Sequence, residues 1–277
     1  MTLHLLGGHK LEISENAYTF DEDLMKSLRP YLTSNIRLGS EFDGGYVIPE
    51  VILNKSNLLI SYGYGHNADF ERDFIRHSAD NKVILYEKNI NILNLTLAIF
   101  KHIGFKITFQ RGFPVYHIYN FVKYLKLKAN RRIKYLNYEI VANTKNKKQL
   151  SFVETLKDIT ENSTIIKMDI EGAEYECLNI NSEIISQVNC LIIEFHQIEL
   201  EKSNFLLIIK NLTKNFSITN LHVNNFALSK SYMPQVIELV LLNRKFLSLQ
   251  KIEYVSKIPS QLDSPNNPKL PDLNFIY

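Results

Sequence analysis

The sequence is poor in cysteine, and its two thiols form no recognisable metal or redox motif. Cys177 lies in a helix-like stretch and Cys190 at the start of an apolar strand, with no CxxC or Cys/His spacing around either. Thiols of this kind are typical of a reducing compartment, where they are buried and unpaired. We therefore expect a cytoplasmic protein without a disulfide framework.

Long apolar runs are also missing. No stretch approaches the roughly 20 residues that span a bilayer, and the first residues lack the cationic start and apolar core of a signal peptide. The formal net charge of +3 gives no reason to expect nucleic-acid binding or membrane insertion. The basic run Lys123–Lys134 is either a solvated helix face or a patch for an anionic substrate.

No internal repeat or low-complexity linker interrupts the 277 residues, a length that suits one domain. Short apolar strands alternate with amphipathic stretches, which indicates a doubly wound, Rossmann-like α/β sheet, mostly parallel and covered on both faces. Strands are expected at 58–62, 82–86, 106–109, 164–168 and 190–195, and helices at 15–32, 68–78, 92–103, 151–159, 173–180 and 201–215. The last two strands, 217–223 and 236–242, have no helix between them, so we expect an antiparallel pair at one edge.

Two segments fall outside this alternation. Residues 1–57 are interpreted as an extension of helix and turns, with a turn at Asp43-Gly44-Gly45 and a short strand at Tyr46–Ile48. Residues 112–150 are aromatic and basic without a clear period, and we interpret them as an insertion that covers the active site or packs against another subunit.

The strand at residues 58–62 ends in a loop that contains Gly63 and Gly65. Glycines there let the backbone approach a ligand at the carboxyl end of the strand, although an ordinary turn would also accept them. The third glycine of the dinucleotide fingerprint is absent, which argues against a bound pyrophosphate. Glu87 ends the next strand and is either a solvent-facing residue or a partner for the vicinal hydroxyls of a ribose.

Asp169 and Glu171 follow the apolar strand at residues 164–168, two positions apart, so that they point to one side in an extended segment. Carboxylates at this place are costly without a function. They can hold the amine of a cofactor, a metal ion or a substrate hydroxyl; alternatively, the dipole of the following helix favours them.

Polar side chains also follow the next strands. Glu194 and His196 share a side at the end of the strand 190–195, where a histidine suits a general base, a metal ligand or a hydrogen-bonded structural role. His222, Asn224 and Asn225 follow the strand 217–223 and either bind a polar substrate or form an ordinary polar turn.

The stretch KMDIEGAEYECL, residues 167–178, resembles the K-x-D-x-E-G-x-E signature of the FkbM-type methyltransferases, and LIIEFH resembles the next strand of that family. Further similarity to a bacterial branch runs from about Arg37 to Asp272. The resemblance implies a class I methyltransferase fold, S-adenosylmethionine as donor and often a sugar or polyketide hydroxyl as acceptor. The positions that it implies for the donor, with their immediate neighbours, are Asp43, Gly44, Gly45, Tyr46, Gly63, Gly65, Glu71, Glu87, Lys88 and Asp169.

We therefore expect an O-methyltransferase of polysaccharide biosynthesis, acting on a sugar or small precursor of a bacterial surface glycan, phosphorylated or not. His196 is the expected base, with Asp169 and Glu171 orienting it or the substrate. The expected substrate-binding residues are Glu171, His196, His222, Asn224 and Asn225. A divalent metal on Asp169, Glu171 and a histidine is a variant without a tight ligand motif. The alternatives are an NAD-dependent oxidoreductase and a non-catalytic scaffold. A homodimer is the one protein partnership that we consider.

Overall fold

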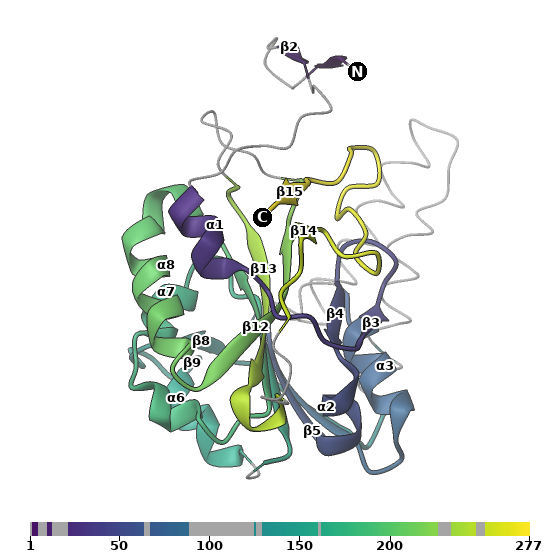
Figure 1. Cartoon of the computed structure of the whole chain (residues 1–277). Helices are drawn as coiled ribbons and strands as arrows, with labels where there is room; N and C mark the ends of the chain where they lie inside the picture. Colours follow the sequence, from purple (N-terminus) through teal and green to yellow (C-terminus); the bar gives the residue numbers. More distant parts are fainter. Residues whose placement is uncertain are drawn as a thin grey trace, which may run out of the picture.

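A seven-stranded sheet forms the centre of the computed structural model, in the order β12-β13-β11-β10-β5-β6-β7 (Figure 1). The structure describes residues 2–4, 10–12, 22–63, 67–88, 125, 129–159, 162–226, 234–247 and 253–277. The strands of the central sheet are β5 (Leu58–Tyr62), β6 (Lys82–Tyr86), β7 (Ile133–Leu136), β10 (Thr164–Met168), β11 (Cys190–Phe195), β12 (Phe216–Val223) and β13 (Ile237–Asn243).

Five strands of the sheet are buried on both faces, and most of their residues are apolar. Every residue of β5, β10, β11, β12 and β13 is buried. β13 is antiparallel to both of its neighbours, β11 and β12, whereas β5, β6, β7, β10 and β11 pair in parallel. The reversed strand therefore lies one position inside the edge formed by β12.

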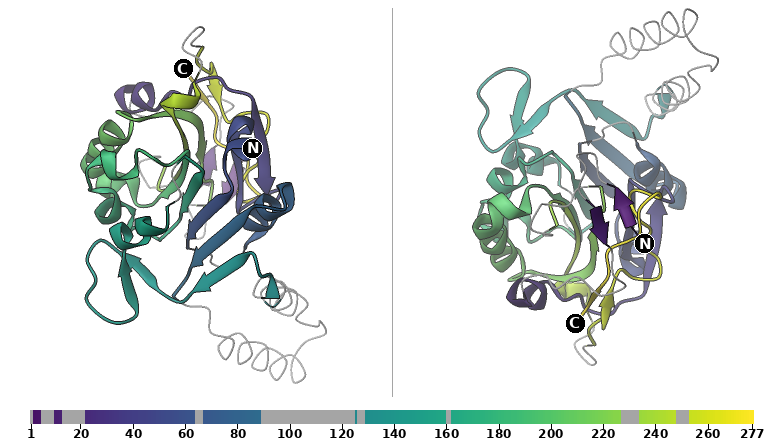
Figure 2. Two further views of the ribbon diagram at one scale, coloured as in Figure 1. Left: turned by 90° about the horizontal axis from the view of Figure 1, so that it is seen from below. Right: turned by 90° about the horizontal axis from the view of Figure 1, so that it is seen from above.

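Helices cover both faces of the sheet, and each face has its own apolar core (Figures 1 and 2). On one face lie α1 (Glu22–Leu28), α6 (Phe152–Thr155), α7 (Glu174–Leu178) and α8 (Ile198–Leu212). On the other lie α2 (Glu50–Lys55), α3 (Asp69–His77) and a hairpin of β3 (Asn35–Gly39) and β4 (Gly45–Pro49). The short remaining elements are β1 (Thr2–His4), β2 (Lys10–Glu12), β8 (Glu139–Val141), β9 (Gln149–Ser151), η1 (Leu156–Asp158), η2 (Ser182–Ile185), η3 (Arg244–Phe246), β14 (Lys257–Ile258) and β15 (Phe275–Ile276).

The structure confirms most of the expected alternation and corrects one part of it. The apolar strands at 58–62, 82–86, 164–168 and 190–195 have the expected bounds. The helix expected at 92–103 and the strand expected at 106–109 lie outside the described residues. The strand next to β6 is instead β7, so part of the segment interpreted as an insertion at 112–150 belongs to the central sheet.

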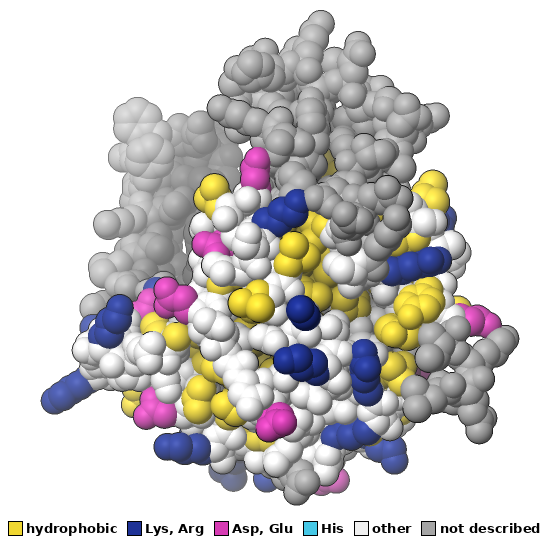
Figure 3. Space-filling model, turned by 60° about the vertical axis from the view of Figure 1, so that its left-hand side comes forward, with side chains coloured by type: hydrophobic (Ala, Val, Ile, Leu, Met, Phe, Trp, Pro, Cys, Tyr) yellow, Lys and Arg dark blue, Asp and Glu magenta, His cyan; other side chains and the backbone are white. Residues whose placement is uncertain are grey.

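Three further features concern the cysteines, the hydropathy of the helices and the surface charge. Both cysteines are buried and free. Among the described residues, no helix is long and apolar enough to cross a membrane. On the face shown in Figure 3, Lys and Arg side chains are scattered among acidic and apolar ones and form no continuous basic patch.

Candidate active site

Three strand ends meet at the point where the sheet changes its winding direction, between β5 and β10. The parallel register places Gly63, Glu87 and Asp169 next to one another there. The Gly63 N–H donates to Tyr86 O at 3.1 Å, and the Asp169 N–H donates to Tyr62 O at 3.0 Å. Open α/β sheets bind their ligands in the crevice outside such carboxyl ends.

Gly63 is a position that only glycine fits. Its φ is +77°, and a Cβ atom there would lie 1.5 Å from the carbonyl oxygen of Asp169. The chain therefore passes closely over β10 as it leaves β5. Glu87 is half-buried at the neighbouring strand end, where a carboxylate can accept hydrogen bonds from both ribose hydroxyls. Gly65 lies outside the described residues.

A buried ion pair between Lys167 and Glu71 contacts the start of the loop after β5. Lys167 Nζ lies 3.4 Å from Gly63 O and 3.9 Å from Glu71 Oε1, and Ser61 Oγ donates to the same carboxylate oxygen at 2.6 Å. Lys167 also lies 5.4 Å from the ring centre of Tyr46. Glu71 was expected among the donor-binding residues. Its side chain is instead fully buried, where it holds the loop in place and does not face the crevice.

The residues after β10 and β11 form a cluster of acidic side chains around His196. His196 Nε2 is 3.8 Å from Asp169 Oδ1 and 3.7 Å from Glu171 Oε2, while Nδ1 is 3.1 Å from Glu174 Oε1. The predicted residues Asp169, Glu171 and His196 are thus brought together. One ligand atom from each of them lies within 4.8 Å of the others.

Glu174, whose side chain is completely buried, holds the turn after β10 and the ring of His196 in position. Its two carboxylate oxygens accept hydrogen bonds from the N–H groups of Ile170 at 2.9 Å and Gly172 at 2.8 Å. The turn between them contains Glu171 at φ 58° and Gly172 at φ 106°. A non-glycine residue with positive φ is uncommon and is held by its surroundings. The contacts of Glu174 therefore orient both the turn and the imidazole of His196.

The charges in the cluster alter its proton affinities. Burial raises the pKa of Asp169 to about 6, although Lys167 and His196 oppose the shift. Burial alone would lower the pKa of His196, but Glu174, Glu194 and Asp169 outweigh it and raise that pKa to about 9. The surrounding carboxylates therefore favour the protonated form of the imidazole, which works against the general-base role that we expected for it.

A second group of buried polar residues adjoins the cluster. The Asn224 Nδ2 group donates to Glu194 Oε1 at 3.0 Å, and Phe226 N–H donates to Asn224 Oδ1 at 2.9 Å. Burial and the charges of Asp169 and Glu238 raise the pKa of Glu194 well above its usual value. Asn224 is thereby occupied by protein contacts.

His222 and Asn225 attach the C-terminal segment to the sheet. His222 lies between Glu238, 3.2 Å from Nδ1, and Asp272, 3.0 Å from Nε2. The Asn225 Nδ2 group lies within hydrogen-bonding distance of three carbonyl oxygens, those of residues 267, 270 and 271, at 3.1 to 3.3 Å. Both side chains are buried with protein partners, so the structure shows them as anchors of residues 267–272.

The tip of the β3–β4 hairpin lies against Asn67. Asn67, which precedes α3, donates to Asp43 O at 2.8 Å and lies against Gly44, where a Cβ atom would approach Asn67 Nδ2 to 2.4 Å. Tyr46, just after Gly45, is buried and packs edge-on against Phe70.

Lys88 points to a different partner from the one expected. Its ammonium group forms an ion pair with Glu139 on β8. The pair lies at the surface beside Glu87, and Gln149 also donates to Glu139, at 3.0 Å. The hydrogen bonds from Lys88 and Gln149 lower the pKa of Glu139.

Sequence reasoning missed Lys167 and Glu174 as parts of the site. A lysine within the apolar strand TIIKM was the available signal for Lys167, because a fully buried ammonium group needs a charged partner. Glu174 lies in the stretch KMDIEGAEYECL but was given no role of its own, whereas its partners are the preceding turn and His196.

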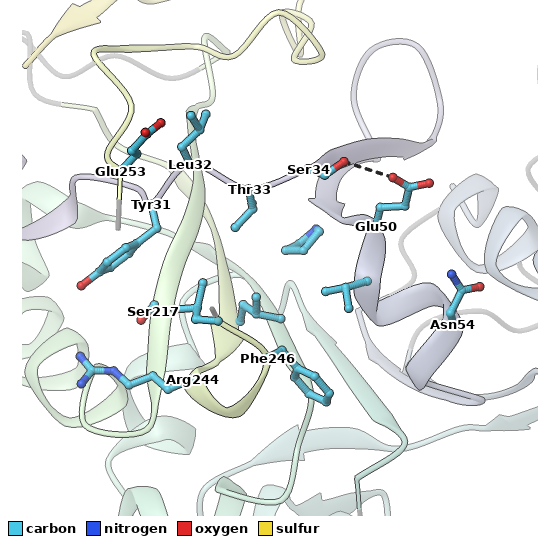
Figure 4. A pocket seen from close by; sticks show the side chains of 14 residues that line it. Tyr31, Leu32, Thr33, Ser34, Glu50, Asn54, Ser217, Arg244, Phe246 and Glu253 are labelled. Carbon is cyan, nitrogen blue, oxygen red and sulfur yellow. Dashed lines mark hydrogen bonds between the residues drawn. The ribbon is translucent and has the colours of Figure 1, made fainter. Parts of the chain in front are cut away.

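A cavity lies away from these residues, at the other end of the sheet, and its lining side chains are shown in Figure 4. It has a volume of about 530 Å³ and lies between the start of α2, the segment at Tyr31–Ser34 and the ends of β12 and β13. Ser34 Oγ donates to Glu50 Oε2 at 3.1 Å on one wall, and Arg244 and Phe246 form part of another. None of the predicted site residues lines it.

The sheet order, with one reversed strand next to the edge, is that of the class I methyltransferase fold. The family model of the FkbM methyltransferase domain matches residues 53–218, and the chain belongs to this family. Family membership favours methyl transfer over the dehydrogenase and scaffold alternatives.

Comparison with solved structures finds distant similarity. A fibrillarin pre-rRNA processing protein of Methanococcus jannaschii is 9% identical, with 69% of this chain and 68% of that chain covered and a TM-score of 0.37. Precorrin-6y C5,15-methyltransferase of Geobacter metallireducens is 11% identical, with 69% and 85% covered and a TM-score of 0.36. Spermidine synthase of Thermotoga maritima is 12% identical, with 70% and 55% covered and a TM-score of 0.38. A search of curated protein sequences gave no significant match.

Proposed function

We propose that the protein transfers a methyl group to a hydroxyl of a sugar or another small precursor of a bacterial surface glycan. The observation that carries the proposal is the adjacency of two sets of residues. Gly63, Glu87 and Asp169 form the edge where the family binds its donor, and the cluster of Asp169, Glu171 and His196 begins at the same aspartate.

We assign separate residues to binding of the donor and to positioning of the acceptor. Bound S-adenosylmethionine supplies an activated methyl group on a sulfonium. Gly63 would allow the backbone close to the donor, Glu87 would accept hydrogen bonds from its ribose, and Asp169 would serve both the donor and the acceptor. Holding the acceptor oxygen in line with the carbon–sulfur bond is chiefly a proximity effect.

The cluster also handles the proton. The acceptor hydroxyl loses its proton to a carboxylate of the cluster or to water, its oxygen forms the new bond to the methyl carbon, and the electron pair of the broken carbon–sulfur bond stays on sulfur. The described charges around His196 are mainly negative: Asp169, Glu171, Glu174 and Glu194. These charges favour a neutral, hydroxyl-bearing acceptor over a phosphorylated one.

Calorimetric titration with S-adenosylmethionine and S-adenosylhomocysteine tests the donor site. Binding should weaken at least tenfold in Glu87→Ala, because the ribose hydroxyls lose their acceptor, and also in Asp169→Ala. Glu176→Gln, an exposed change on α7, is the matched control. Well-folded protein that binds neither ligand would refute the proposal.

Transfer of labelled methyl groups to a panel of neutral sugars, sugar phosphates and aminosugars then tests the acceptor. The proposal predicts labelled methyl ethers with neutral sugars. Label only on nitrogen, or only on the phosphorylated acceptors, would contradict the class that we propose.

A further inference from the structure

The geometry around His196 points to a divalent-cation site formed by Asp169, Glu171 and His196. We infer that the cation takes an acceptor hydroxyl as a further ligand, so the inference rests on the proposed function for its role but not for its binding. The three side chains come from two loops, after β10 and β11, that meet at the same sheet edge.

The distances leave a gap of the right size. His196 Nε2 lies 3.7 and 3.8 Å from its two carboxylate neighbours, which is longer than a hydrogen bond. Two ligand atoms at roughly 2.0–2.2 Å from one tetrahedral cation lie about 3.3–3.6 Å apart, so the three side chains need to close in by only a few tenths of an ångström to hold one. Nε2 therefore faces two oxygens across a space that no direct hydrogen bond closes.

The opposite side of the imidazole has the partner that metal-binding histidines usually have. Glu174 Oε1 lies 3.1 Å from Nδ1, which leaves Nε2 as the ligand atom. The backbone N–H groups of Ile170 and Gly172 fix the carboxylate of Glu174 in turn. The buried carboxylate thus sets the ring orientation independently of any cation.

The balance of charge points the same way. Asp169, Glu171, Glu174 and Glu194 surround one imidazole, and Lys167 is already paired with Glu71. A dication would offset this excess of negative charge. The mixed set of imidazole and carboxylates suits cations such as Mn²⁺ and Zn²⁺. The Glu171 side chain is 86% exposed, so the solvent side stays open for the hydroxyl of an acceptor.

Binding of Mn²⁺ to the full chain, followed by calorimetry and by the electron paramagnetic resonance signal of free Mn²⁺, tests the site directly. One Mn²⁺ should bind per chain. Glu171→Gln and His196→Gln should each weaken binding at least tenfold. Glu174→Gln should weaken it roughly 10- to 100-fold through the ring orientation. Glu176→Gln, also on α7, should bind as the wild type does.

Titration with S-adenosylhomocysteine separates this inference from the proposed function. A chain that binds S-adenosylhomocysteine but no Mn²⁺ overturns the cation site and leaves the donor site standing. Mn²⁺ binding that is unchanged in both Glu171→Gln and His196→Gln also overturns it. Mn²⁺ binding that these variants lose, in a chain without donor affinity, supports the cation site and refutes the proposed function. Because Glu171 is exposed, Glu171→Gln should fold, and thermal unfolding checks the other variants.

Discussion

Among the three strand ends at Gly63, Glu87 and Asp169, the position of Gly63 is the one where we expect a substitution to destabilise the fold most. Replacing Gly63 by Ala should lower the free energy of unfolding by more than the roughly 1–3 kcal/mol of an unfavourable φ alone, because the added Cβ would meet Asp169 O. Gly172→Ala is the matched control: its φ is also positive, but the nearest atom to its Cβ would be Gln197 Nε2 at 3.4 Å. Urea unfolding that finds equal losses in the two variants would contradict this explanation.

His222 should make stability depend on pH. Burial alone would lower its pKa, but Glu238, Asp272 and Asp263 outweigh it and raise the pKa well above 6.5. The folded state therefore holds a proton more tightly than the unfolded one. The contribution is complete below about pH 6.5 and is lost as pH rises toward the folded pKa, by up to about 1.4 kcal/mol per pH unit.

The measurement is urea unfolding of the wild type and of His222→Gln at pH 6 and pH 9. The difference in unfolding free energy between the two proteins should shrink at pH 9. A difference that stays constant, or that grows with pH, would show that His222 is neutral in the folded protein.

The residue scale also shows how far the candidate site could be predicted. Asp169, Glu171 and His196 were found because each follows an apolar strand, and parallel strands bring their carboxyl ends together. The contacts of Glu71 on α3 were not found, because Ser61 and Lys167 reach it from two different strands, β5 and β10. Such pairings depend on register across the sheet, which one strand does not reveal.

At the scale of elements, the buried strands were predicted from the sequence and the half-exposed strands were not. β5, β10 and β11 had the expected bounds because both of their faces are apolar. β7 has the sequence IKYL, in which only Ile133 is buried, so periodicity gave no signal for it. β3 was missed because none of its residues is fully buried and its stability comes from pairing with β4.

Residues 267–271 have no helix or strand, and their carbonyl groups are held by Asn225. Replacing Asn225 by Ala should lower the free energy of unfolding by about 1–3 kcal/mol, because carbonyl groups of residues 267–271 lose their donor. The segment should then be cleaved faster in limited proteolysis. Asn274→Ala is the control, since Asn274 is exposed and has one hydrogen bond, to Asp272 O at 3.3 Å. Equal cleavage of both variants and the wild type would contradict the anchoring role.

At the scale of the whole molecule, the sheet separates two apolar cores, and polar groups gather where its strands end. One core packs under α1, α7 and α8, and the other under α2 and α3. The first core extends to Tyr62, Tyr86 and Met168, the last residues of β5, β6 and β10, directly before Gly63, Glu87 and Asp169. A ligand that contacts these three strand ends would therefore stabilise the fold by holding several strands together at once.

This arrangement predicts that donor binding and global stability are linked. S-adenosylhomocysteine at about 100 times its dissociation constant should stabilise the folded protein by about 2.7 kcal/mol. For a chain of this size, that corresponds to a rise in Tm of roughly 5–10 °C. Differential scanning calorimetry with increasing ligand measures the shift, and Glu87→Ala at the same ligand concentration should show little of it. Because Glu87 is half-buried at a strand end, its loss should leave the Tm of the free protein within a few degrees of the wild type. A ligand-induced rise that Glu87→Ala retains in full would place the donor away from β6 and contradict the assignment of this edge.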